Sequence, residues 1–196
     1  EELEKKNNDI LDSIRYAKVI QTAILPPDKL FDKLLPESLV LFKPKDIVSG
    51  DFYWINTKGD KILFAAADCT GHGVPGAFVS MVGYNLMDKI VGEYDITEPA
   101  AILDRLNFEV AQTFRQKGEE ETGTKVQDGM DIALVAYDRK KGTLEYAGAF
   151  NPLYLLRNGE VIEYKANRSP IGSFKAGEQQ KFDNHTIKLQ NGDRIY

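Results

Sequence analysis

Residues 50–73 of the chain read GDFYWINTKGDKILFAAADCTGHG, and no other stretch constrains the architecture as strongly. Gly59 and Asp60 form a two-residue turn signal with glycine first, and they separate two runs rich in aromatic, β-branched and alanine residues. The pattern predicts a β-hairpin whose strands are apolar on both faces, as strands in the middle of a sandwich are. Counting outward from the turn, the predicted register places Asp51 directly opposite Asp68.

Two opposed aspartates need a chemical explanation. Directly opposed side chains lie roughly 5 Å apart at Cβ, and like charges there are destabilising. The two carboxylates can share a proton, or they can hold a hard divalent cation through oxygen. A third interpretation treats them separately, with Asp51 starting a strand and Asp68 capping a turn. Their position at one end of one hairpin favours the cation, so Asp51 and Asp68 are candidate metal ligands.

A glycine-punctuated loop follows Asp68 and leads into a helix predicted over 74–91. Pro75 suits the first helical turn, where its missing N–H costs nothing. The N-terminus of a helix carries free N–H groups and the positive end of the helix dipole. Beside a metal site, that combination is suited to binding a phosphate group.

Several motifs carry a family resemblance in combination. They are SGDFY at 49–53, DCTGHGVP at 68–75, AGAFNPL at 147–153, SPIG at 169–172 and the lead-in segment AKVIQTAILP at 17–26. Together they resemble the metal-dependent protein phosphatases of the PPM, or type 2C, family, in the bacterial branch typified by SpoIIE and RsbU. Phe150 stands where that family's Ala-Gly-His-Asn-Pro stretch has its histidine. The resemblance covers residues 14–196.

The resemblance implies an α+β fold, an α-β-β-α sandwich of two mainly antiparallel sheets flanked by helices, and two bound Mn²⁺ or Mg²⁺ ions. It implies hydrolysis of phosphoserine or phosphothreonine on a regulatory protein, an anti-sigma-factor antagonist, by a water that bridges the metals. By the same resemblance, Asp51 would bridge both ions, Asp68 would ligate one, and the backbone carbonyl of Cys69 would complete that turn.

The chain departs from the family pattern at its C-terminal end. Residues 191–196 are expected to form a turn and the first half of a strand that, in the family, continues into a Thr-Asp-Gly or Ser-Asp-Gly motif. The third and fourth metal-binding carboxylates are therefore expected to be missing from a C-terminally truncated domain. This departure keeps an alternative open, a catalytically silent, dimeric signalling module that binds a partner without turnover.

Four further side chains are candidates for roles in the site. His72 is a candidate acid that protonates the leaving serine oxygen, or it hydrogen-bonds the loop, or its side chain is simply exposed. The Cys69 thiol lies near a helix N-terminus, but no arginine-ended phosphate loop surrounds it, so a small buried residue is the favoured interpretation. Asp128 and Asp131 resemble a weaker third metal ligand of some family members, although a strand-start cap is favoured for them.

The N-terminal residues 1–25 are predicted to form a linker helix, with 26–196 as the phosphatase domain. Leu3, Ile10, Ala17 and Ile24 recur every seven residues. This spacing indicates either a frayed surface helix or the end of a parallel coiled coil that joins an upstream sensor domain and forms a homodimer. The two interpretations are left open here.

Composition excludes several classes of function. The net charge is −5 with no basic stripe, which argues against nucleic-acid binding. One cysteine excludes a disulfide framework and suggests the cytoplasm, either free or as the cytoplasmic part of a membrane-anchored sensor. Further predicted elements are a helix at 98–116, a polar loop near the site at 117–127, a final strand pair around 191–192, and strands at 38–43, 130–138, 143–149, 152–157 and 160–164.

Overall fold

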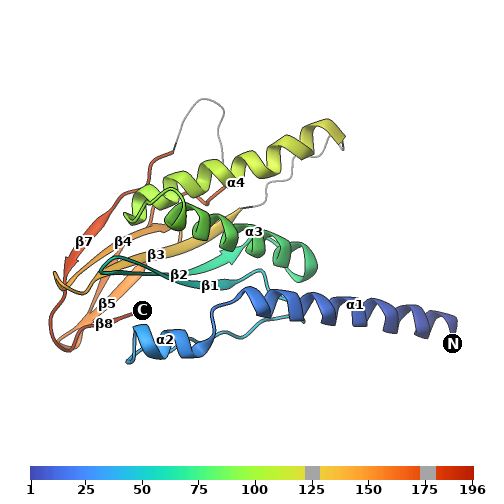
Figure 1. Cartoon of the computed structure of the whole chain (residues 1–196), viewed down its shortest axis with the longest axis horizontal. Coiled ribbons are helices and arrows are strands. Elements are labelled where there is room, and N and C mark those ends of the chain that lie inside the picture. The colour runs from blue at the N-terminus through green and yellow to red at the C-terminus, as the bar shows by residue number, and fades with distance from the viewer. Residues whose placement is uncertain (122–128, 173–179) are drawn as a thin grey trace.

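The computed structural model describes residues 1–121, 129–172 and 180–196 as two antiparallel β-sheets with helices packed around them (Figure 1). The larger sheet has the strand order β1-β2-β3-β4-β7, and the smaller has the order β6-β5-β8. The expected α+β class and two antiparallel sheets are confirmed. In chain order the elements are α1 (Glu2–Ile24), α2 (Asp28–Leu34), β1 (Phe52–Lys58), β2 (Lys61–Cys69), α3 (Gly73–Gly92), α4 (Pro99–Glu121), β3 (Met130–Asp138), β4 (Thr143–Ala149), β5 (Leu153–Arg157), β6 (Glu160–Tyr164), β7 (His185–Lys188) and β8 (Arg194–Ile195).

The hairpin of β1 and β2 has the predicted register. Lys58 lies opposite Lys61 beside the turn, and Phe52 lies opposite Ala67 at the other end of the ladder. Gly59 in the turn has φ +59°, a left-handed conformation that glycine adopts without a steric penalty. Local turn chemistry therefore determines the register of the whole hairpin.

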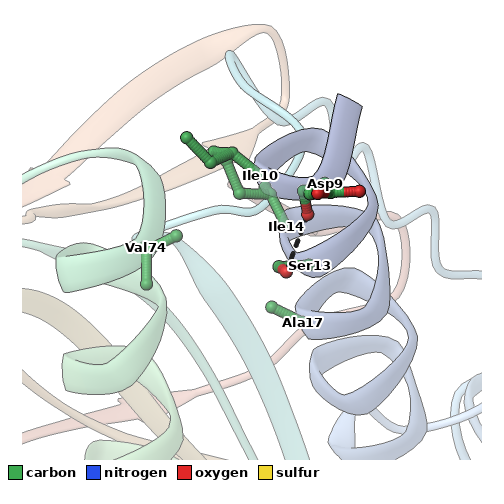
Figure 2. A pocket seen from close by; sticks show the side chains of 6 residues that line it. All are labelled: Asp9, Ile10, Ser13, Ile14, Ala17 and Val74. Carbon is green, nitrogen blue, oxygen red and sulfur yellow. Dashed lines mark hydrogen bonds between the residues drawn. The ribbon is translucent and has the colours of Figure 1, made fainter. Parts of the chain in front are cut away.

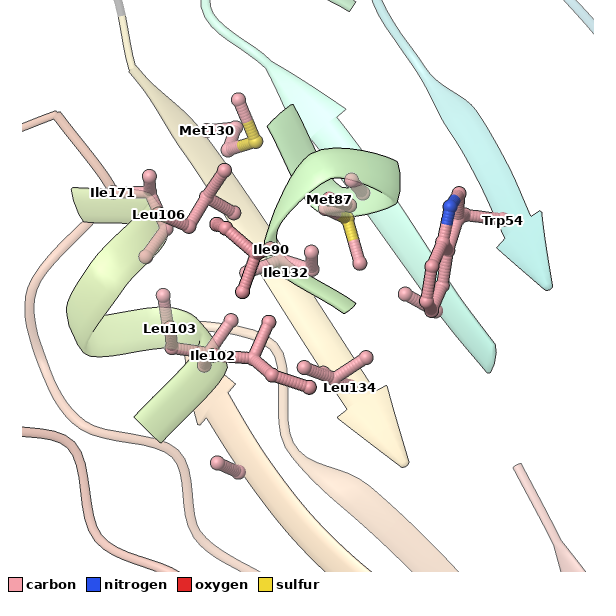
Figure 3. Packing of buried hydrophobic residues seen from close by; sticks show 14 of the residues in the cluster. Trp54, Met87, Ile90, Ile102, Leu103, Leu106, Met130, Ile132, Leu134 and Ile171 are labelled. Atoms are coloured by element: carbon pink, nitrogen blue, oxygen red, sulfur yellow. The ribbon is translucent and has the colours of Figure 1, made fainter. Parts of the chain in front are cut away.

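Helices α3 and α4 cover one face of the larger sheet and form the main core with it (Figure 3). Large side chains from both layers are fully buried there, and each contributes about 1.5–3 kcal/mol relative to leaving it exposed. The ring nitrogen of Trp54 donates a hydrogen bond of 2.8 Å to Asp88 on α3, so the largest core residue is also oriented. Members of this core include Trp54, Met87, Ile90, Leu103, Leu106, Met130, Ile132 and Leu134.

The opposite face of the larger sheet is covered by the smaller sheet and by α2. Val135 and Tyr146 of the larger sheet pack against Leu155 of β5. Phe31 of α2 packs against the β1–β2 hairpin through a separate small cluster. The layers are therefore helices, sheet, then sheet with α2. The hairpin forms the β1 edge of the middle layer, and both of its faces are covered as its sequence predicted.

Helix α1 ends before Pro26, as expected, but little of it touches the body. Its N-terminal end extends away from the sandwich in Figure 1, and Leu3 and Ile10 are 83% and 59% exposed. Across the three described ranges, no helix combines the length and the apolar character needed to cross a membrane.

One predicted strand and one predicted helix end were wrong. The strand expected at 38–43 does not form: Val40 and Phe42 face inward and Leu39 and Leu41 are exposed, but no strand pairs with this segment among the described residues. The side chains alternate between inward and exposed as in a strand, yet a strand also needs a hydrogen-bonded partner. Helix α4 continues to Glu121, so the loop expected from residue 117 begins at least five residues later, and its remainder lies outside the described residues.

The final two strands do not pair with each other, contrary to expectation. β7 adds to the larger sheet beside β4, whereas β8 adds to the smaller sheet beside β5. Arg157 of β5 makes two hydrogen bonds to the Asp193 carboxylate, of 2.8 and 2.6 Å, and this ion pair holds the turn before β8 against β5. The turn thus connects two sheets instead of closing a hairpin.

Candidate metal centre

Asp51 and Asp68 face each other at the open end of the β1–β2 hairpin. One step beyond the Phe52–Ala67 pair brings them opposite each other, with both residues still reaching solvent. The pKa of Asp51 is raised above its ordinary value of 3.8 by burial first, then by a side-chain hydrogen bond with Asp68 and by the charge of Asp68. Holding both carboxylates charged is therefore unfavourable in the metal-free protein.

Asp131 extends this pair into a row across three strands. It lies directly opposite Asp68 in the β2–β3 ladder. Its pKa is also raised, by burial first and then by the negative charge of Asp68. From the sequence, a strand-start cap was favoured for Asp131. Its position opposite Asp68 could not be counted from the sequence, because β2 and β3 are joined by a long connection through two helices. Asp128, its companion candidate, lies outside the described residues.

The three carboxylates form a row and not a cage. Within the described ranges, no three acidic, histidine or cysteine side chains converge closely enough to hold one metal ion. Equally, no ion pair with lysine, arginine or histidine involves Asp51, Asp68 or Asp131 in those ranges. Among the described residues, the fold therefore brings these negative charges together without pairing them with a positive one.

The loop after Asp68 packs against the residue before Asp51 through bare backbone. A Cβ atom added to Gly50 would lie 2.8 Å from the carbonyl oxygen of Gly71 and 3.1 Å from that of Cys69. A Cβ atom on Gly76 would lie 2.6 Å from the same Gly71 oxygen. This close approach explains the glycines and brings the Cys69 carbonyl, the third proposed ligand, next to the Asp51 turn.

The same loop is tied to the start of β3. The Thr70 amide donates to the carbonyl of Gly129 at 2.8 Å, and the Thr70 hydroxyl is 2.6 Å from both the nitrogen and the oxygen of Gly129. Met130 and Ile171 exchange two backbone hydrogen bonds on the other side. Asp131 therefore follows a rigidly held backbone.

His72 lies immediately before α3 with most of its side chain exposed. Its Nδ1 atom is 3.2 Å from Oδ2 of Asp46. Asp46 lies in the loop that precedes Ser49–Asp51, which we call the metal-site turn. The contact joins the loop before Asp51 to the loop after Asp68 and orients the imidazole ring. The sequence-based alternatives for His72, a proton donor or a loop contact, are compatible in this arrangement.

A separate cavity of about 340 Å³ lies between α1 and the start of α3 (Figure 2). It is lined by Asp9, Ile10, Ser13, Ile14, Ala17 and Val74, mostly through apolar atoms. None of the three carboxylates of the row lines it. The cavity shows that α1 is not sealed against α3 along this part of its length.

The residues present fit a divalent cation. Two opposed carboxylates and a nearby backbone carbonyl form an all-oxygen donor set, which hard cations such as Mg²⁺ and Mn²⁺ prefer. Within residues 1–121, 129–172 and 180–196, no basic side chain pairs with the two carboxylates. The pKa of Asp51, which is raised by burial first and also by the charge of Asp68, agrees with this fit, since a bound cation would stabilise the charged form of the carboxylate.

Comparisons with known proteins give a consistent result. The family model described as Stage II sporulation protein E (SpoIIE) matches residues 58–196. The SiaA-PP2C domain of Pseudomonas aeruginosa is 34% identical with a TM-score of 0.80, over 97% of this chain and 71% of that one. No curated protein sequence matches the chain.

Two more distant structures share the fold. The PP2C phosphatase domain of SpoIIE from Bacillus subtilis, solved with a fragment of its regulatory domain, is 22% identical with a TM-score of 0.56, over 74% of this chain and 39% of that one. RsbX, solved in complex with magnesium, is 17% identical with a TM-score of 0.53, over 76% of this chain and 64% of that one.

Proposed function

Because this chain belongs to the SpoIIE family and is a phosphatase domain of the PP2C type, we propose that it removes phosphate from a phosphoserine or phosphothreonine of a regulatory protein with Mg²⁺ or Mn²⁺ bound at Asp51 and Asp68. The observation that carries the proposal is the pair of opposed carboxylates, to which the described part of the chain offers no basic partner. No structural need of the hairpin explains two such charges, whereas a cation does.

Each residue of the site has a proposed task. Asp51 and Asp68 hold the ions from adjacent strands, whose hydrogen-bonded ladder keeps the two carboxylates at a constant separation. The carbonyl of Cys69 adds a neutral oxygen ligand from the loop that packs on Gly50. When bound, divalent ions of this kind neutralise phosphoryl oxygens and activate water at neutral pH.

His72 is proposed to protonate the serine or threonine oxygen that leaves phosphorus. Its Nδ1 atom lies 3.2 Å from a carboxylate oxygen of Asp46, and this contact holds the ring in one orientation. Its exposure leaves the ring accessible to a protein substrate, which needs an open site.

The substrate is proposed to be an anti-sigma-factor antagonist that carries a phosphoserine. The proposal is supported by the motifs shared with the SpoIIE and RsbU branch and by an open site: Asp51, Asp68 and His72 all reach solvent. A folded phosphoprotein can approach such an edge, whereas a deep pocket would favour a small molecule.

Residues 1–25 are proposed to be a linker helix that forms a coiled-coil homodimer and joins an upstream sensor to residues 26–196. The exposure of Leu3 and Ile10, two members of the seven-residue repeat in α1, supports this, because a helix that served this domain alone would bury such side chains. Sedimentation equilibrium should then give a dimer that Ile10→Glu converts to a monomer.

A second function, partner binding without turnover, is favoured by one observation. The row of carboxylates lacks a third group converging on Asp51 and Asp68 in the described ranges. The two functions separate on one variant, since Asp51→Asn abolishes turnover only if turnover exists, and it leaves partner binding in place under either.

The deciding experiment measures Mn²⁺-dependent release of phosphate from a phosphorylated anti-sigma-factor antagonist and from para-nitrophenyl phosphate. Wild type, Asp51→Asn and the matched variant Asp60→Asn, at the opposite end of the same hairpin, are compared. We expect activity in wild type and Asp60→Asn alone. Absence of phosphate release from the wild-type protein would remove the proposal.

A further inference from the structure

The one buried residue of α1 is polar. Gln21 is 6% exposed, whereas Leu3, Ile10 and Val19 of the same fully described helix are largely exposed. Burying an amide costs free energy unless its polar atoms find partners. We therefore expect Gln21 to make specific hydrogen bonds and not only non-directional contacts. An apolar side chain would attach a helix at lower risk.

Gln21 binds the chain just before the metal-site turn. Its Oε1 accepts a hydrogen bond of 2.9 Å from the Ser49 amide, and its Nε2 donates one of 2.6 Å to the Ser49 carbonyl. Nε2 also donates to the Ser80 hydroxyl of α3 at 3.0 Å. Both backbone groups of a single residue, Ser49, are therefore held by one side chain from α1.

Ser49 passes this constraint to Asp51. Its hydroxyl accepts a 3.0 Å hydrogen bond from the Asp51 amide. Gly50, between them, lies against the carbonyl oxygens of Gly71 and Cys69 on its other side. The turn that presents the Asp51 carboxylate is thus fixed between Gln21 and the loop that follows Asp68.

The attachment of α1 depends strongly on this contact. Nearer the N-terminus of α1, Ile10 and Ile14 are separated from Val74 of α3 by the cavity in Figure 2. At the C-terminal end of α1, Leu25 is partly buried against the main core. Gln21 and Leu25 therefore anchor the C-terminal end of α1, and only Gln21 touches the metal-site turn through hydrogen bonds.

We propose that Gln21 is a positioning residue for the metal centre: it holds the Ser49–Asp51 turn so that Asp51 faces Asp68, and it makes metal affinity depend on docked α1. The inference rests on the proposed function, since it needs a metal at Asp51 and Asp68. Gln21 does not touch the metal or the substrate. It acts through Ser49, and a displacement of α1 would change metal affinity before it changed the fold.

The test measures Mn²⁺ binding by isothermal titration calorimetry without substrate, thermal unfolding in EDTA, and activity against Mn²⁺ concentration. Gln21→Met keeps the approximate volume and removes the three hydrogen bonds. Leu25→Ala loosens the same end of α1 through apolar packing, and Gln112→Ala changes an exposed glutamine on α4.

We expect Gln21→Met to weaken Mn²⁺ binding about tenfold, the equivalent of one or two hydrogen bonds. At saturating Mn²⁺ its kcat should return to within about twofold of wild type, because the defect lies in positioning the ligand and not in chemistry. Leu25→Ala should lower the melting temperature with a much smaller change in affinity, and Gln112→Ala should match wild type.

Two results would overturn the inference while leaving the proposed function intact. One is wild-type Mn²⁺ affinity in Gln21→Met. The other is an equal loss of affinity in Leu25→Ala at an equal fall in melting temperature, which would make Gln21 a structural anchor alone. If wild type and Asp51→Asn bind Mn²⁺ equally, the metal centre itself is wrong and both proposals fall.

Discussion

The two ends of the β1–β2 hairpin carry opposed like charges but treat them differently. At the turn end Lys58 and Lys61 lie opposite each other, and each has an acidic partner within the chain. At the open end Asp51 and Asp68 lie opposite each other with no basic partner in the described ranges. The ion pairs at the turn end are Lys58–Asp95, Lys61–Glu145 and Asp60–Lys140.

The difference between the two ends shows how this protein offsets like-charge repulsion where the charges are only structural. Repulsion between opposed lysines is removed locally by surface carboxylates, at little cost and for little gain. Among the described residues, the same remedy is missing at the open end, where burial and the neighbouring Asp68 both raise the pKa of Asp51. A site that keeps repulsion in the metal-free state is prepared for a cation from solution.

The largest expected effect is on activity. Asp51→Asn should reduce phosphate release by about a hundredfold or more, since even residues that only support a metal ligand often cost 10- to 100-fold. Asp60→Asn, at the turn end, should stay within about twofold of wild type. Steady-state kinetics at saturating Mn²⁺ make the comparison, and equal losses at the two ends would erase the distinction between them.

Alanine in place of glycine should separate the two ends next. Gly50→Ala places a methyl group 2.8 Å from a backbone carbonyl, so we expect a loss of about 1–3 kcal/mol in unfolding free energy and weaker Mn²⁺ binding. Gly59→Ala has open space around it and pays only for its left-handed φ, about 1 kcal/mol. Urea unfolding and calorimetry measure both. Unchanged metal affinity in Gly50→Ala would show that the close approach is structural only.

Removing one charge at the open end should stabilise the metal-free protein. In EDTA at neutral pH, Asp51→Asn is expected to gain about 0.5 kcal/mol after solvent screening, or about 1–2 °C in melting temperature. Asp60→Asn should gain nothing, because it loses an ion pair with Lys140. Differential scanning calorimetry measures the shift. A melting temperature that falls in Asp51→Asn would mean the carboxylate is held for structural reasons.

The smallest expected effect is the pH dependence of that gain. A carboxyl whose folded pKa is raised destabilises the folded state above that pKa, and the penalty is relieved as pH falls through it towards 3.8. The stability advantage of Asp51→Asn in EDTA should therefore shrink on acidification from neutral pH and be lost near 3.8. An advantage that grows on acidification would reverse the assigned sign.

Local chemistry explains which features the sequence could predict. The hairpin register follows from Gly59 and a two-residue turn, so the opposition of Asp51 and Asp68 could be counted without a structure. The helix after Pro75 was predictable for the same reason, since turns, caps and apolar periodicity lie within a few residues of each other. The layered architecture was instead expected from the family resemblance.

Features that depend on distant pairing could not be predicted. The position of Asp131 opposite Asp68 requires the β2–β3 register, which is separated from the hairpin by two helices. The contact of Gln21 with Ser49 joins residues 28 apart, and nothing in the local pattern around Gln21 indicates a buried amide. The segment 38–43 alternates as a strand does, but alternation does not supply a partner.

The measurement closest to the central claim is anomalous diffraction at the manganese edge from crystals grown with Mn²⁺. We expect an anomalous peak within ligand distance of the carboxylates of both Asp51 and Asp68, and no peak in crystals of Asp51→Asn. A peak elsewhere, or two carboxylates that point to opposite faces of the sheet in the metal-loaded crystal, would contradict a cation held between β1 and β2.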